Sequence, residues 1–179
     1  MPDHPRPLVR AASLVVAVVL VVSTASCTPR PTLAQLERTL YATSLPAFRN
    51  WWRQEHARAQ HVGPATVDRW LASETGRLDA AAARTRPWNL STDLCSFAPD
   101  TGPVFDFRIP CIRHDFAWRN LRRLQTRLGG GIDTRARRQR ATRQFLRDMQ
   151  ATCAIRPVVQ RPACQAMAGA YFHAVSAVS

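Results

Sequence analysis

The chain has 179 residues, of which 46% are apolar, so it can bury one sizeable core. This length excludes a large multidomain protein, and one compact domain is expected. The formal net charge is +13, and all 25 basic residues are arginine. A charge of this sign draws an exported protein toward anionic surfaces such as acidic lipid headgroups.

Residues 1–27 have the pattern of a secretory signal peptide. Arg6 and Arg10 precede an apolar run over 11–22, and small residues follow as far as Cys27. The apolar run is shorter than the roughly 20 residues that a membrane-spanning helix needs. We therefore expect export of the chain rather than a transmembrane anchor.

Two processing routes are compatible with this segment. Cleavage after Ala25 would give a freely secreted protein, whereas residues 24–27 resemble a bacterial lipobox and would make Cys27 the lipidated first residue. Removing Cys27 leaves an even set of cysteines, suited to two disulfide bonds in an oxidising compartment: Cys95, Cys111, Cys153 and Cys164. The even number favours lipid anchoring at the outer face of a bacterial membrane over plain secretion.

A proline-rich tether at 28–32 leads into a single domain over 33–179. Helical spacing after a Thr32 cap predicts a first helix over 33–40, Pro46 interrupts it, and further helical segments cover 48–55 and about 67–76. From 87 to 110 turn-forming residues replace the periodicity, which predicts a long functional loop.

Two long helices are expected after this loop. The first runs from Cys111 to the glycines at 129–131, and the second from about Asp133 to the residue before Pro157, followed by a weakly helical tail over 163–178. No segment shows convincing strand alternation, so the predicted fold class is all-α. Two long helices joined by a glycine turn should pack antiparallel.

The first long helix carries the most informative residues. Cys111, His114, Asp115 and Trp118 have the spacing of one helix face. If Cys95 bonds Cys111, the closed loop brings the Asp93 carboxylate and the Leu94 carbonyl against that face. Carboxylate and carbonyl oxygens are the ligands that Ca²⁺ prefers, and one imidazole without a free thiolate pair argues against zinc.

Ester hydrolysis is the chemistry that this arrangement suggests. A calcium ion would stabilise the negative charge on an ester oxygen while a neutral His114 takes a proton from an attacking water. Taken alone, the His-Asp pair favours a buried structural histidine beside an Asp115 paired with Arg113 or Arg119. The second acid, Asp93, on a loop that a disulfide would close, instead favours a catalytic role for the His-Asp pair.

The residues also resemble a known family. The segments 91–95 and 111–120 (STDLC and CIRHDFAWRN), with the later pair Cys153 and Cys164, are similar to the small secreted phospholipase A2 family of bacteria and fungi. The resemblance covers about residues 88–175. It implies a compact helical fold with two antiparallel helices and calcium-dependent hydrolysis of the sn-2 ester of glycerophospholipids.

The same resemblance implies a role for each site residue. Asp93, the Leu94 carbonyl and Asp115 match the calcium ligands, and His114 matches the general base. Two disulfides are implied, Cys95 with Cys111 and Cys153 with Cys164.

One position departs from the family pattern. The family pairs its histidine with an aspartate on the second helix, and that position is Thr142 here. Thr142 shares a stripe with Phe145, Met149 and Cys153, so it faces the first helix but brings no charge. We expect its hydroxyl, or a water, to hold the imidazole nitrogen, and turnover to be slower for lack of the carboxylate.

Three functions are compatible with these features. The first is the calcium-dependent phospholipase A2 activity, acting at a phospholipid membrane or micelle surface. The second is a non-catalytic exported protein of the same fold that binds lipid or a partner, and the third is a cationic surface-binding protein with a structural His-Asp pair. An exported, disulfide-bonded chain seldom meets nucleic acid, so no nucleic-acid partner is expected, and the protein is expected to be a monomer.

Overall fold

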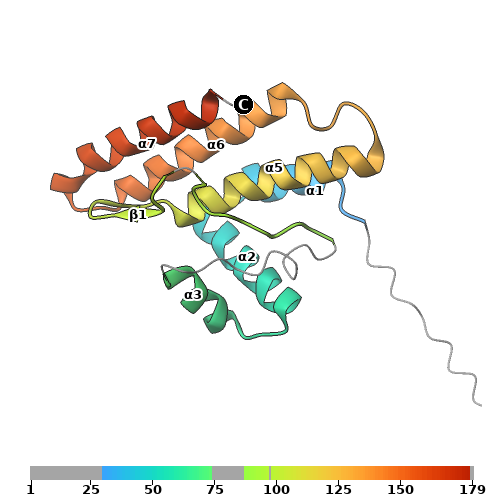
Figure 1. Cartoon of the computed structure of the whole chain (residues 1–179), viewed down its shortest axis with the longest axis horizontal. Helices are drawn as coiled ribbons and strands as arrows, with labels where there is room; N and C mark the ends of the chain where they lie inside the picture. The colour runs from blue at the N-terminus through green and yellow to red at the C-terminus, as the bar shows by residue number, and fades with distance from the viewer. Residues whose placement is uncertain (1–29, 74–86, 97, 178–179) are drawn as a thin grey trace, which may run out of the picture.

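The structure is a computed structural model that describes residues 30–73, 87–96 and 98–177. The expected signal peptide, Cys27 and the end of the segment expected over 67–76 lie outside these ranges. The described chain is mostly helical, which confirms the all-α class (Figure 1). None of its helices combines the length and the apolar character that crossing a membrane requires.

The amino-terminal half contains α1 (Leu33–Glu37), a π-helical turn η1 (Arg38–Ala42), α2 (Leu45–Gln60) and α3 (Pro64–Ala72). Thr32 and Gln35 form a capping box at the start of α1, and the Ser44 hydroxyl caps α2. Pro46 lies in the first turn of α2, where a missing amide hydrogen costs nothing. The proline therefore helps to start this helix, which begins at Leu45.

Pro46 thus marks the start of α2 rather than a break within a helix.

The carboxy-terminal half contains β1 (Thr101–Gly102), β2 (Phe105–Asp106), α5 (Arg108–Leu128), α6 (Arg135–Ala154), a 3₁₀ turn η2 (Val158–Gln160) and α7 (Arg161–Ser176). α5 ends at Gly129, whose positive φ of 88° favours glycine, and the Thr134 hydroxyl caps α6. α5 and α6 pack together as the expected antiparallel pair, and α7 returns along α6 (Figure 1).

The structure contains a β-hairpin that periodicity did not predict. β1 and β2 form an antiparallel hairpin that pairs Thr101 with Asp106 and Gly102 with Phe105. The Phe105 ring covers Gly102 so closely that a Cβ there would lie 2.5 Å from the ring. α5 also starts at Arg108 rather than Cys111, because its first turn tolerates Pro110.

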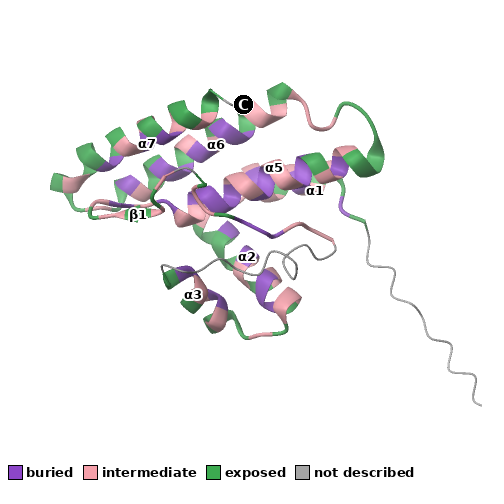
Figure 2. Ribbon diagram, in the orientation of Figure 1, coloured by how far each residue is buried: buried purple, intermediate pink, exposed green. Residues whose placement is uncertain are grey.

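Buried side chains form two clusters that both include residues of α5. Figure 2 shows buried residues along α5 in purple. The first joins α5 to α1, η1, α2 and α3 and contains Phe48, Trp52 and Phe116. The second joins the start of α5 to the hairpin, α6 and α7 and contains Phe107 and Met149. α5 is therefore the helix that both halves of the domain pack against.

A buried ion pair links these elements. Arg113 on α5 is 2% exposed, and its Nη1 lies 3.4 Å from Asp148 Oδ1 on α6. The same guanidinium donates to the carbonyl oxygens of Leu40 and Thr43. Burial raises the pKa of Asp148 and lowers that of Arg113, so both groups carry a desolvation penalty that the pairing offsets.

Replacing Asp148 by alanine should leave the Arg113 charge buried without its partner. We expect Asp148→Ala to lower the free energy of unfolding by about 3–5 kcal/mol, measured by urea denaturation. The matched control is Glu55→Ala, which removes the ion pair with the exposed Arg58 and should cost less than about 1 kcal/mol. Equal losses in the two variants would contradict the structural role of the buried pair.

Candidate active site

The loop of residues 89–95, called the site loop below, lies along one face of α5. Cys95 bonds Cys111 near the start of the helix, with a Cα–Cα distance of 5.3 Å. At the other end of the site loop, Asn120 Oδ1 accepts from Asn89 N at 2.9 Å, and Asn120 Nδ2 donates to Asn89 O at 2.8 Å. The helix therefore fixes both ends of the loop.

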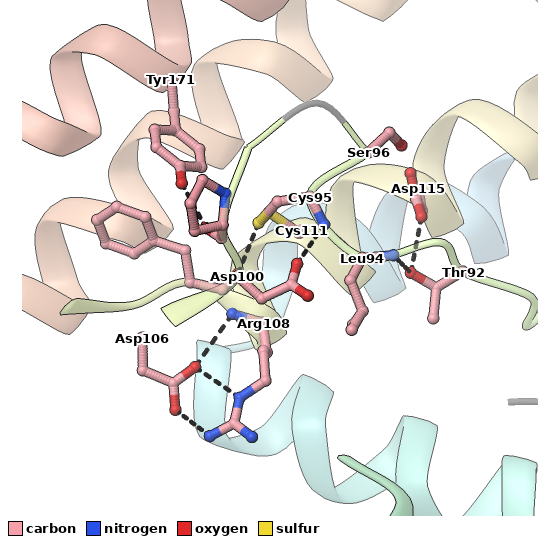
Figure 3. The surroundings of a disulfide bond; sticks show 12 residues. Thr92, Leu94, Cys95, Ser96, Asp100, Asp106, Arg108, Cys111, Asp115 and Tyr171 are labelled. Atoms are coloured by element: carbon pink, nitrogen blue, oxygen red, sulfur yellow. Dashed lines mark hydrogen bonds and ion pairs between the residues drawn. A yellow bond between two sulfur atoms is a disulfide. The ribbon is translucent and has the colours of Figure 1, made fainter. Parts of the chain in front are cut away.

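Between these ends, Asp115 of α5 holds the middle of the site loop. The Thr92 hydroxyl donates to Asp115 Oδ2 at 2.7 Å, and the Asp93 amide donates to the same oxygen at 3.1 Å. Figure 3 shows the Thr92 side chain turned toward Asp115, with Leu94 and Cys95 following on the loop. Asp115 thus holds the backbone that carries the second predicted acid, Asp93.

Leu94 adopts a left-handed backbone conformation, with φ of 59°. Its amide donates to Thr92 Oγ1 at 2.9 Å, and the next amide, of Cys95, donates to Asp100 Oδ1 at 2.7 Å. A non-glycine residue rarely takes this conformation, and such residues cluster at ligand-binding sites. The disulfide and these hydrogen bonds hold the loop in this shape.

Arg119 lies between the two predicted acids. Its guanidinium pairs with Asp93 and lies 3.6 Å from Asp115 Oδ2, while its Nη1 donates to Ser91 Oγ at 3.0 Å. Asp93 also accepts from the Ser96 hydroxyl at 2.7 Å. One guanidinium thus balances two neighbouring carboxylates.

The two carboxylates differ in their affinity for a proton. Burial raises the pKa of Asp115 to about 7; the hydrogen bond from Thr92 opposes this shift, and the nearby Asp93 adds to it. The pKa of Asp93 is lowered, because hydrogen bonds with Asp115 and Ser96 and the charge of Arg119 outweigh its own burial. Below about pH 7, therefore, the proton of the pair resides on Asp115.

His114 lies next to this pair and faces α6. Its Nε2 lies 3.4 Å from Thr142 Oγ1, and its ring centroid lies 5.0 Å from that of Phe145 and 5.6 Å from that of Trp118. Burial lowers the pKa of His114 to about 4. The imidazole is therefore neutral at physiological pH and is held among aromatic rings opposite a hydroxyl.

The pocket beside His114 has a volume of about 1010 Å³. Its polar wall comes from α5 and the site loop, and its apolar wall from α6 and α7. The lining residues of these walls include Leu94, His114, Asp115, Arg119, Arg122, Phe145, Tyr171 and Val175. A large pocket with one apolar and one polar wall suits a ligand that has an acyl chain and a charged headgroup.

Both predicted disulfides are present. Cys95–Cys111 joins the site loop to α5, and Cys153–Cys164 joins the end of α6 to the start of α7. The second bond fixes α7, which supplies much of the apolar wall of the pocket.

Two contacts of the site were not predicted from the sequence. The sequence suggests Arg119 as a partner of Asp115, but its pairing with Asp93 was not predicted. Nothing in the sequence indicates that the hydroxyl of Tyr171, labelled in Figure 3, donates to the Pro99 carbonyl. The first could have been found from the acids, because an arginine one helical turn after Asp115 can reach both. The second joins segments 72 residues apart and has no local signal.

Within the described ranges, no group of three or more His, Cys, Asp or Glu side chains is arranged to hold a metal ion. The donors that the structure does bring together are the carboxylates of Asp93 and Asp115 and the backbone of Leu94 between Asp93 and Cys95. These oxygen donors fit a hard cation such as Ca²⁺. Two adjacent carboxylates that share one arginine also repel each other, and a divalent cation would relieve that repulsion.

Comparison with known proteins agrees with this geometry. No curated protein matches the chain in sequence. A family model described as prokaryotic phospholipase A2 matches residues 65–179, which include the site loop, α5, α6, α7 and both disulfides. This is more than half of the chain, and the chain belongs to the prokaryotic phospholipase A2 family.

Proposed function

We propose that the protein hydrolyses the sn-2 acyl ester of glycerophospholipids in a calcium-dependent reaction at a membrane or micelle surface. The observation that carries the proposal is the position of His114 and Asp115 in the wall of one large, mainly apolar pocket. Family membership supports phospholipid hydrolysis in general. We further propose that a monomer acts outside the cell, either secreted or anchored through Cys27.

Substrate binding follows from the two walls of the pocket. The apolar wall, with Phe145, Tyr171 and Val175, would receive an acyl chain. Arg119 and Arg122 on the polar wall carry positive charge that would attract the phosphate of the headgroup. This arrangement would place the ester between the chain and the headgroup, beside His114.

The residues that would hold Ca²⁺ are Asp93, Leu94 through its carbonyl, and Asp115. When bound, the ion would supply positive charge that stabilises the oxyanion formed at the ester carbonyl. Arg119 now balances these carboxylates and would have to give up part of this pairing. Asp115 would have to be ionised to act as a ligand.

His114 would act as the general base. Because Nε2 faces the Thr142 hydroxyl, Nδ1 is the ring nitrogen left to take a proton from water as the water oxygen bonds to the ester carbon. The same proton would then pass to the sn-2 oxygen as the ester C–O bond breaks, which releases a fatty acid and a lysophospholipid. The low pKa of His114 keeps the imidazole neutral above about pH 4, so Nδ1 has a free lone pair, but it also makes the imidazole a weak base.

A second candidate function is non-catalytic binding of lipid or of a partner on the same fold. The observation that favours it is the Thr142 hydroxyl opposite His114, because a neutral hydroxyl stabilises an imidazolium less than a carboxylate does. Binding of phospholipid vesicles without release of fatty acid would support this alternative.

The central test is fatty acid release from a phospholipid labelled in the sn-2 chain. We expect release with Ca²⁺, loss of release with chelator, and a drop of at least about 100-fold in kcat for His114→Ala. The matched control is His61→Asn, a histidine change at the exposed end of α2 that keeps a residue tolerant of positive φ. No release with Ca²⁺, or unchanged release by His114→Ala, would contradict the proposal.

Restoring a carboxylate opposite His114 should strengthen the base. We expect Thr142→Asp to raise kcat by roughly tenfold or more, and to raise the pKa of His114 above its value of about 4, because a nearby negative charge favours the imidazolium. NMR titration of the imidazole measures the pKa. Thr142→Asn is the control of similar shape without the charge, and an equal pKa rise in that variant would contradict the electrostatic explanation.

Calcium affinity should depend on pH through Asp115. The pKa of this acid is raised to about 7, so below that pH a proton competes with the ion, and above it the carboxylate is already free. We expect calorimetry to show affinity falling by up to about tenfold per pH unit below 7, and little change from pH 7.5 to 8.5. Equal affinity at pH 5.5 and pH 8 would contradict the assignment of Asp115.

A further inference from the structure

The turn between α6 and α7 exposes an aliphatic cluster. The large hydrophobic side chains that are most exposed in the described part of the chain are Leu128 at 59%, Ile155 at 84%, Val158 at 71% and Val159 at 88%. Ile155, Val158 and Val159 lie within this one turn, which is called the tip below and covers residues 155–161. Isolated exposed leucines are ordinary, whereas a contiguous aliphatic cluster indicates a binding surface.

The fold holds the tip in this exposed position. The Cys153–Cys164 disulfide closes the base of the turn, and both cysteines are fully buried. Within the turn, Arg156 N donates to Cys153 O at 3.1 Å, Gln160 N donates to Pro157 O at 2.8 Å, and Arg161 Nε donates to Arg156 O at 2.9 Å. The turn that joins α6 to α7 (Figure 1) is therefore braced, and it carries the exposed aliphatic side chains.

The charge around the tip is positive. Arg156 and Arg161 lie beside the aliphatic side chains, and the sequence contains no Asp or Glu after Asp148. Arg156 interacts electrostatically with Asp106, and this acid is itself paired with Arg108. Aliphatic side chains flanked by guanidinium groups complement an anionic bilayer, in which acyl chains lie beneath a layer of phosphates.

We propose that the tip inserts Ile155, Val158 and Val159 into the surface of an anionic phospholipid bilayer, while Arg156 and Arg161 contact the phosphates. The proposal rests on the proposed function only in its choice of a phospholipid surface as partner. α7 runs from the tip to the pocket wall at Tyr171 and Val175, so one helix connects the membrane contact with the pocket. Three aliphatic side chains offer too little area for a stable dimer, which argues against a second copy as the partner.

The test compares vesicle binding by tip and control variants, all carrying Cys27→Ser so that no lipid is attached. The tip variant is Ile155→Ser/Val158→Ser/Val159→Ser, and the matched control is Leu128→Ser, an exposed aliphatic change at the other end of the helical pair. We expect the tip variant to bind phosphatidylglycerol vesicles at least about tenfold more weakly, and the control to stay within about twofold of the parent. Binding should also weaken with salt.

Equal binding by the tip variant and the parent would overturn the proposal. So would equally tight binding of the parent to neutral phosphatidylcholine vesicles, or a parent dimer in sedimentation that the tip variant dissociates. Hydrolysis of a short-chain phospholipid below its micelle concentration should be unchanged in the tip variant. If neither the parent nor the tip variant hydrolyses that substrate, the proposed function is contradicted. A loss of vesicle binding in the tip variant would still support insertion of the tip into the bilayer.

Discussion

Asp115 accepts hydrogen bonds from Thr92 and Asp93, and this contact positions the site loop between its two fixed ends at Cys111 and Asn120. The contacts follow the helix in order, so the loop runs antiparallel to α5. A regular helix face thus sets the position of an irregular loop. Because α5 is itself buried between two clusters, the position of the loop depends on the packing of the whole domain.

Adjacent residues of α5 have different roles because they lie on different sides of the helix. Arg113 points into the interior, where it binds Asp148 and two backbone carbonyls. His114 faces Thr142 and the pocket, and Asp115 faces the site loop. Burial acts on each group: it opposes the charge of Arg113, keeps His114 neutral and raises the pKa of Asp115. Acid-base properties of the site therefore follow from the packing of one helix.

Much of this arrangement could be predicted from the sequence. The 3.6-residue period placed Thr142 on the stripe that faces α5, and its hydroxyl lies 3.4 Å from His114 Nε2. The glycines at 129–131 indicated the turn, and the family resemblance implied both disulfides. The hairpin was missed because two-residue strands are too short to show alternation. The Arg119 bridge was missed even though the expected position of Asp93 beside Asp115 places both acids within reach of an arginine one helical turn further along α5.

The proposed calcium site can be tested by a crystal structure determined with Ca²⁺. We expect an ion bound by the carboxylates of Asp93 and Asp115 and the carbonyl of Leu94, with the Arg119 guanidinium moved away from at least one carboxylate. An ion bound elsewhere, or an Arg119 that still bridges both carboxylates at saturating Ca²⁺, would contradict it.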